Sequence, residues 1–235
     1  MISTSGTLGS VSTTYGTASP IPTTFRLSGD NLAGPIQVSA PNGYEVSANG
    51  TDYLSSVTVG AAGTLSSTQI SVRLASTTVP GTYTGNVVCS SLAATVVNVA
   101  TASSTVDKKT ITISGISAAP KPYDGSTVAT ISGTPGLVGL EGQDATRVAL
   151  SSPLANFVSA NAGQDIDVVA TYSLTGAAAS YYNLTQPSGL MAEIQKKPAT
   201  IRANDQTKTA GTLLVLGTGQ TTFTASGLIS GERIA

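Results

Sequence analysis

Apolar and polar residues alternate along this chain with a period of two, and this pattern constrains the fold more than any other feature. Side chains that alternate in this way point to opposite faces of a β-strand, so each alternating run predicts a strand with one buried face. The alternating apolar residues of the first hundred positions include Phe25, Leu27, Tyr44, Val46, Ile70, Val72 and Leu74. Clusters of Gly, Asn and Pro, which favour turns, separate the runs at 28–31, 41–43, 49–50, 60–63 and 80–81. About seven short strands with turns at regular spacing predict an antiparallel β-sandwich.

The pattern begins again near Val106 and once more near Lys197. Residues 110–114 alternate cleanly, and a pair of lysines precedes a strand-like run both at 108–109 and at 196–197. Recurrence over the length of one small domain indicates tandem modules. We therefore predict an all-β chain with domains at residues 1–105, 106–196 and 197–235, the last being a partial repeat.

The residue content argues against several classes of function. The chain has no His and a single Cys, so the usual general base, an internal disulfide and a structural zinc site have no residues to form them. A net charge of −1 gives no reason to expect nucleic acid as a partner. No apolar run is long enough to insert into a membrane as a helix. We expect no catalytic residues, no cofactor and no metal, and therefore a protein that is not an enzyme.

Tyr123, Asp124 and Gly125 form a short motif that invites a functional assignment. Asp accepts backbone hydrogen bonds in turns, and Gly adopts the positive φ that turns require. Tyr can pack its ring and use its hydroxyl for a hydrogen bond at the edge of a domain. We interpret the three residues as a structural motif.

Some other residues allow more than one interpretation. Asp144, Asp165 and Asp167 could offer oxygen ligands to calcium, but no complete calcium loop is present, so exposed carboxylates are the favoured interpretation. The adjacent Tyr181 and Tyr182 would be the aromatic platform of a carbohydrate-binding module. Cys89 is expected to be a small buried apolar residue.

Residues 217–222 contain two glycines but lack the lysine of a phosphate-binding loop. We expect a hairpin turn at these residues.

Three stretches resemble known families of bacterial surface proteins. Residues 121–127, Lys-Pro-Tyr-Asp-Gly-Ser-Thr, resemble the signature of YDG-type repeats, and 172–176 and 182–187 are similar to the closing segments of that repeat. Residues 201–206 and 223–228 resemble the start of an MBG-type repeat. Residues 28–32 and 40–47 resemble an Ig-like module. These resemblances imply tandem Ig-like antiparallel β-sandwich modules, with a YDG-type repeat followed by the start of an MBG-type repeat.

The expected function is that of a non-catalytic stalk segment in an exported bacterial adhesin, at the cell surface or secreted. Such a segment spaces or presents a binding region, and its partners are the neighbouring repeats and a glycan or protein ligand whose identity the sequence leaves open. One alternative is a subunit of an extracellular filament assembled by β-strand exchange, since strands of an incomplete repeat have open edges. A second alternative is a carbohydrate-binding accessory module of a secreted protein.

Overall fold

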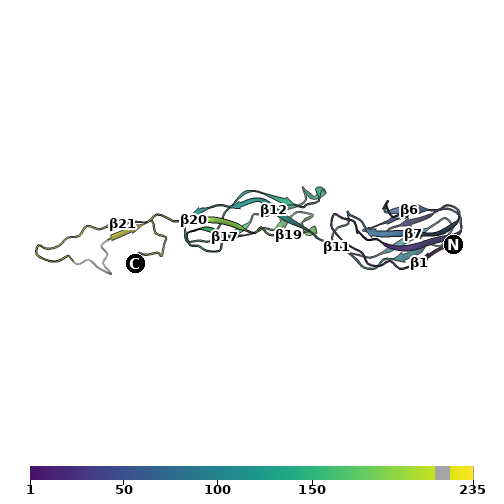
Figure 1. The fold of residues 1–235 in the computed structure, drawn as a ribbon, viewed down its shortest axis with the longest axis horizontal. Helices are drawn as coiled ribbons and strands as arrows, with labels where there is room; N and C mark the ends of the chain where they lie inside the picture. The colour runs from purple at the N-terminus through teal and green to yellow at the C-terminus, as the bar shows by residue number, and fades with distance from the viewer. Residues whose placement is uncertain (215–222, 235) are drawn as a thin grey trace. The chain divides into compact units, whose positions relative to one another are not determined.

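The fold is all-β, as predicted, in a computed structural model that describes residues 1–214 and 223–234 (Figure 1). The strands before residue 108 are β1 (Ile2–Ser5), β2 (Ser12–Thr14), β3 (Thr23–Leu32), β4 (Ile36–Ser39), β5 (Tyr44–Ser47), β6 (Ser56–Val59), β7 (Gly63–Leu74), β8 (Gly81–Tyr83), β9 (Asn86–Ser90), β10 (Val97–Ala100) and β11 (Ser104–Asp107). The later strands are β12 (Lys109–Ala118), β13 (Lys121–Pro122), β14 (Ile131–Val138), β15 (Ala149–Leu150), β16 (Leu154–Phe157), β17 (Gly163–Thr171), β18 (Leu174–Thr175), β19 (Tyr182–Leu184), β20 (Leu190–Gln195), β21 (Thr200–Ala203) and β22 (Phe223–Ser226). In these described ranges, two short 3-10 helices, η1 (Gly142–Asp144) and η2 (Ala179–Tyr181), occur between strands.

The residues group into two compact units, neither of which is continuous in sequence. The first comprises Met1–Ile111, Gly139–Ala149 and Leu174–Leu184, and the second comprises Thr112–Val138, Leu150–Ser173 and the chain from Thr185 onward. The predicted middle domain, 106–196, thus contributes residues to both units. The pairing of β19 with the first residues of β12 places the segment around η2 with the N-terminal part of the chain. The hydrogen bond from Tyr15 to Asp144 does the same for the segment around η1.

Two four-stranded sheets supply the core of the first unit. Their strand orders are β1-β3-β7-β5 and β10-β9-β4-β6, and every neighbouring pair in them is antiparallel. The fully buried side chains come from both sheets and include Leu27, Ile70, Val72, Ile36, Val87 and Cys89. The alternation in the sequence therefore identified the buried faces of these strands correctly.

Residues 28–31 form an irregular part of a strand and not the turn that their composition predicts. They lie inside β3, whose register against β7 shifts between Leu27 and Gly29 and again between Gly29 and Leu32. Asn31 has a φ of 49°, which Asn tolerates better than most residues. The same residue types favour turns and β-bulges, which is why the turn prediction was wrong here.

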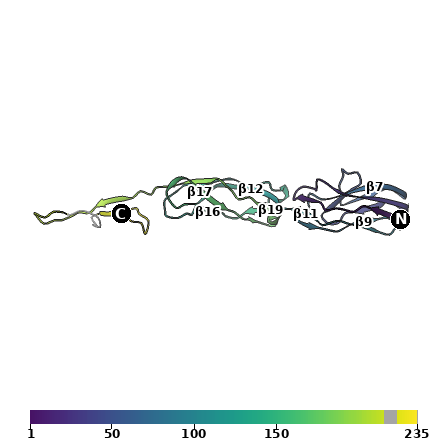
Figure 2. The ribbon, with the colours of Figure 1, turned by 60° about the horizontal axis from the view of Figure 1, so that its bottom comes forward.

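Several strand pairs are parallel, so the prediction of purely antiparallel sheets holds only in part. The first residues of β12 pair in parallel with β19, and β13 pairs in parallel with β20. Figure 2 shows β16 beside β17, and this pair is antiparallel, as are β17 and β20. β11 pairs in parallel with β2 and antiparallel with β8.

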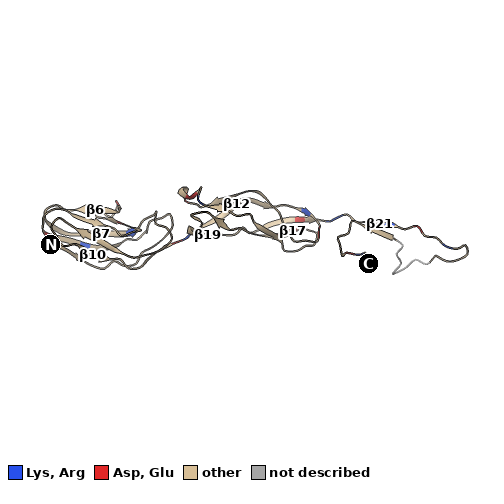
Figure 3. Ribbon diagram, turned by 180° about the vertical axis from the view of Figure 1, so that it is seen from behind, with Lys and Arg blue, Asp and Glu red and all other residues tan. Residues whose placement is uncertain are grey.

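Charged residues are sparse on both units (Figure 3), as expected from their 10% share of the sequence. Among the described residues, ion pairs join Glu45 to Arg73 at 2.6 Å and Lys121 to Asp124 at 2.7 Å. The described residues contain only four ion pairs, and each has at least one partner partly exposed to solvent. Apolar burial and hydrogen bonds therefore supply most of the stability, because partly exposed pairs contribute little.

Candidate functional site: a buried carboxylate and a Tyr-Asp-Gly turn

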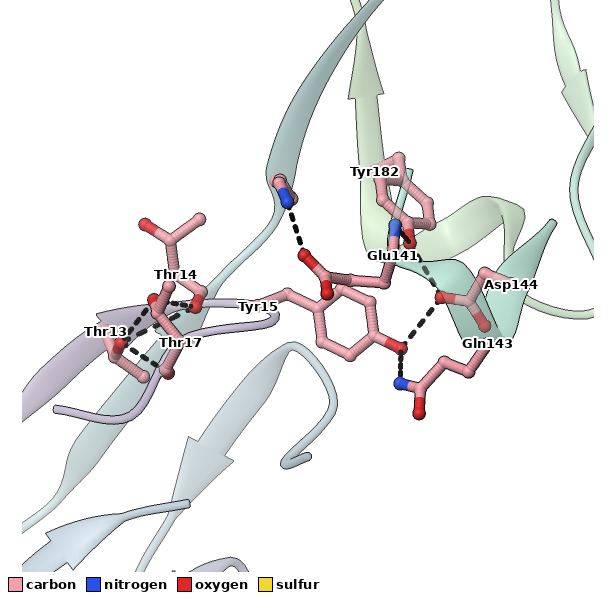
Figure 4. A network of polar contacts seen from close by, with 9 residues as sticks. Thr13, Thr14, Tyr15, Thr17, Glu141, Gln143, Asp144 and Tyr182 are labelled. Atoms are coloured by element: carbon pink, nitrogen blue, oxygen red, sulfur yellow. Dashed lines mark hydrogen bonds and ion pairs between the residues drawn. The ribbon is translucent and has the colours of Figure 1, made fainter. Parts of the chain in front are cut away.

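Asp144, the last residue of η1, is fully buried and accepts three hydrogen bonds from other side chains. The hydroxyls of Tyr15 and Tyr182 donate to the same carboxylate oxygen, Oδ2, at 2.8 and 2.7 Å (Figure 4). Arg147 Nη1 donates to Oδ1 at 3.0 Å. A buried carboxylate is costly unless it is paired and hydrogen-bonded, and Asp144 meets both conditions. The Arg147 side chain is 45% exposed, so the balancing positive charge remains in contact with solvent.

Backbone contacts bring three distant segments of the first unit to this carboxylate. Tyr15 follows β2, and its N–H donates to the carbonyl of Asp107 at 2.9 Å. Tyr182 is the first residue of β19, which pairs with the start of β12. The N–H of Arg147 donates to the carbonyl of Asp144 at 2.8 Å, which keeps the arginine beside the acid.

The two tyrosine hydroxyls accept hydrogen bonds as well as donating them. Gln143 Nε2 donates to Tyr15 Oη at 3.0 Å, and the backbone N–H of Glu141 donates to Tyr182 Oη at 3.1 Å. The Tyr15 ring also meets Tyr181 and Tyr182 edge-on, with ring centroids 5.2 and 5.6 Å apart. In the described part of the chain every buried side-chain nitrogen or oxygen has a partner, and a polar network satisfied in this way favours a single rigid arrangement.

Both hydroxyls stay protonated well above neutral pH. Burial, and after it the hydrogen bond to Asp144, raises the pKa of Tyr15 and that of Tyr182 above the usual value. A phenolate beside the Asp144 carboxylate would place two negative charges together away from water. The tyrosines therefore act as neutral donors in this network. Lys109 forms an ion pair with Glu141 next to them.

Tyr123 is half-buried, and both its backbone and its side chain form hydrogen bonds. Its N–H donates to the carbonyl of Gln195 at 2.8 Å, and its hydroxyl donates to Glu232 Oε1 at 2.6 Å. The hydrogen bond to Glu232 is the main cause of a raised pKa at Tyr123 and of a lowered pKa at Glu232. The ring thus connects the turn to residues much later in the second unit.

Asp124 and Gly125 form the turn itself. Asp124 Oδ1 accepts hydrogen bonds from the N–H and the hydroxyl of Ser126, both at 2.9 Å, and Gly125 has a φ of 75°. Lys121 Nζ lies 2.7 Å from Asp124 Oδ1 and donates to the carbonyls of Ser126 and Val128 at 2.8 and 3.1 Å. Lys121 first, and then the Ser126 N–H, lower the pKa of Asp124 to about 2. The lysine therefore closes the loop from 121 to 128.

The Tyr-Asp-Gly turn lies within residues 107–189, and these residues match the YDG domain family. This segment is a YDG domain. It begins one residue after the predicted boundary at 106 and ends before the predicted boundary at 196. No curated protein matches the chain.

The YDG domain contains Asp144 and Tyr182, whereas Tyr15 precedes it. No local pattern in the sequence indicates this connection, because Tyr15 and Asp144 are separated by 129 positions. Asp144 was expected to be an exposed carboxylate, and this expectation was wrong, since its two oxygens are occupied by Tyr15, Tyr182 and Arg147. Asp165 and Asp167 lie exposed on β17. In the described residues we find no group of three or more acidic or cysteine side chains arranged to hold a metal ion.

The structure also bears on the tyrosine pair at 181–182 and on Cys89. Tyr182 is 4% exposed and Tyr181 is half-buried against Tyr15, so the pair does not form an exposed aromatic platform. Cys89 is buried, as predicted, and burial raises its pKa to about 11. The turn expected at 217–222 lies outside the described residues. Over the described ranges, no helix has the length and apolar character needed to cross a membrane.

Proposed function

We propose that this chain is a non-catalytic spacer segment of an exported bacterial cell-surface adhesin. The observation that carries the proposal is the network at Asp144, which joins Tyr15 to η1 and β19 of the YDG domain. A spacer must transmit force without bending or opening where one module meets the next. Only Lys108 separates β11 from β12. Tyr15 contacts both Asp107, at the end of β11, and Asp144, in η1, so it links the strand before Lys108 to a later part of the YDG domain.

The module types are part of the same proposal. We infer an Ig-like β-sandwich at 1–105, supported by two antiparallel sheets that share a buried core. We infer the start of an MBG-type repeat at 197–235, supported by the β21–β22 pair and by the sequence resemblance. The neighbouring repeats of the parent protein are then its direct partners, outside the cell and at its surface. The segment spaces or presents the binding region of the adhesin.

The decisive experiment exchanges this segment in the parent protein on living cells. An antibody against the chain should label intact cells, and adhesion should persist when the segment is replaced by unrelated β-sandwich domains of equal length. Deletion of the segment without replacement should reduce adhesion, because the binding region then lies closer to the cell. Labelling only after lysis, or loss of adhesion on exchange with equal-length domains, would refute the proposal.

Strand exchange is a second candidate function, favoured by the exposure of β21 and β22. Every residue of both strands is exposed, and within the described ranges the two strands pair only with each other. A two-stranded sheet is marginally stable in water, and its open edges offer backbone donors and acceptors to another chain. Sedimentation across a wide range of concentrations should then show growing assemblies, with fibres visible by electron microscopy. A persistent monomer at high concentration would eliminate this candidate.

A further inference from the structure

The tyrosines around Asp144 are arranged for a reaction as well as for packing. Tyr15 and Tyr182 direct their hydroxyls at one oxygen, Asp144 Oδ2, at 2.8 and 2.7 Å, so the two phenolic oxygens lie close together. Their ring centroids are 5.6 Å apart and the ring planes are inclined by 82°. In a biphenol linked through the carbons next to each hydroxyl, the two hydroxyls also lie side by side and the rings are also inclined. The folded chain therefore already brings together the two hydroxyls and the two rings that the linked product contains.

We propose that Tyr15 and Tyr182 are a site of oxidative cross-linking, where hydrogen peroxide and a haem peroxidase produce a dityrosine. This inference does not depend on the proposed spacer function, because the reaction requires only the folded chain and the oxidant.

Asp144 is placed to accept the protons that the reaction releases. A neutral phenol loses its hydroxyl proton when it loses an electron, and a base within hydrogen-bond distance favours that step. Asp144 Oδ2 is within this distance of both hydroxyls.

Tyr181 gives the oxidant access to the buried pair. Tyr15 and Tyr182 are 1% and 4% exposed, so a peroxidase does not reach either ring directly. Tyr181 is half-buried, and its ring centroid is 5.2 Å from that of Tyr15. An electron removed from Tyr181 at the surface is replaced by one from Tyr15, which transfers the oxidation inward.

The atoms and electrons of the reaction balance. Each of the two phenols loses one electron and its hydroxyl proton, and hydrogen peroxide takes up both electrons and both protons to give two molecules of water. One carbon–carbon bond forms between the ring positions next to the hydroxyls. The hydrogens on those two carbons then move to the phenolic oxygens, which restores both aromatic rings. The chain loses two hydrogen atoms in all.

The test treats the purified chain with hydrogen peroxide and a haem peroxidase at low protein concentration. We expect a monomer with the mass of two fewer hydrogens, blue biphenol fluorescence, and a cross-linked tryptic peptide pair, 1–26 with 148–196. Tyr182→Phe and Tyr15→Phe should each abolish the product. Tyr181→Phe should slow its formation several-fold while leaving its identity unchanged. Tyr53→Phe, at a tyrosine whose ring lies under the Arg73 guanidinium, is the matched control and should react as the wild type does.

Circular dichroism and a melting curve for each variant separate loss of reactivity from loss of fold. If a folded Tyr182→Phe variant still gives the 1–26 to 148–196 cross-link, the bond is formed by Tyr172 or Tyr181 and the assignment is wrong. A product that is only intermolecular, or no loss of two hydrogens from the folded wild type, likewise overturns the proposal.

Discussion

Tyr182 donates its hydroxyl hydrogen to Asp144 at 2.7 Å, although 38 positions separate the two residues. Tyr15 reaches the same carboxylate from before the YDG domain. Asp144 is thus the point at which the N-terminal segment, η1 and β19 are held together. Its removal affects all three segments at once.

Asp144→Ala should lower the free energy of unfolding by about 3 kcal/mol, because it leaves two buried hydroxyls with one partner fewer and creates a cavity. Denaturant unfolding followed by circular dichroism measures the change. Asp167→Ala is the matched control, since Asp167 is exposed on β17, and it should change stability by less than about 0.5 kcal/mol. Equal effects of the two substitutions would contradict the role of Asp144.

Alkaline pH should destabilise the first unit. The pKa values of Tyr15 and Tyr182 are raised in the folded chain, so above about pH 10, where free tyrosine ionises, the unfolded state loses phenolic protons first. The stability that these hydroxyls contribute is therefore complete below that pH. It is lost as the pH rises through the pKa values that the two tyrosines have in the folded chain. Melting temperatures measured from neutral to strongly alkaline pH should fall, and fall less in the double variant Tyr15→Phe/Tyr182→Phe. An identical fall in that variant would contradict the assignment.

The Tyr-Asp-Gly turn should respond to acid in the opposite sense. The pKa of Asp124 is about 2 in the folded chain, below the ordinary value of 3.8. Its contribution is therefore present above about pH 4 and is lost as the pH falls toward 2. NMR titration of the side-chain carboxyl measures this directly. Lys121→Gln should raise the pKa toward 3.8, because the ion pair at 2.7 Å is removed.

Local sequence predicts those parts of the molecule that depend on neighbouring residues. Ile70, Val72 and Leu74 alternate in β7 and are all fully buried, because a strand with one face on a core needs this period. Asp124 and Gly125 likewise have the turn contacts that their side-chain chemistry favours. The YDG domain could be recognised from the sequence because its Tyr-Asp-Gly motif consists of consecutive residues.

Contacts between distant residues could not be predicted in the same way. Nothing near Asp144 in the sequence distinguishes it from Asp167, yet one is buried under two tyrosines and the other is exposed. The parallel pairing of β12 with β19 could not be predicted for the same reason, since it depends on which segments meet once the chain has folded. Only the packing of residues far apart along the chain decides such features.

Cys89 should be inert in the folded chain. It is buried, and its pKa is raised to about 11 by that burial, so the reactive thiolate is both scarce and shielded. A thiol-specific reagent should react with it rapidly in denaturant, and in buffer only at the rate at which the first unit opens. Rapid reaction in buffer without denaturant would show that the sheet around Cys89 opens easily.

Gly176→Ala should separate the effect of a steric clash from that of backbone strain. Gly176 has a φ of 103°, and a Cβ at this position would lie 2.3 Å from the carbonyl oxygen of Arg147, so η2 would have to move away from the segment that carries Asp144. Gly50→Ala is the matched control, because Gly50 has a φ of 79° with no atom within 4 Å of the added carbon. The control should cost about 1 kcal/mol for the positive φ alone, whereas Gly176→Ala should cost about 3 kcal/mol, since an overpacked site adds to the strain. The same denaturant unfolding measures both variants. Equal losses would mean that the close approach to the Arg147 carbonyl oxygen adds no steric cost to that of the positive φ.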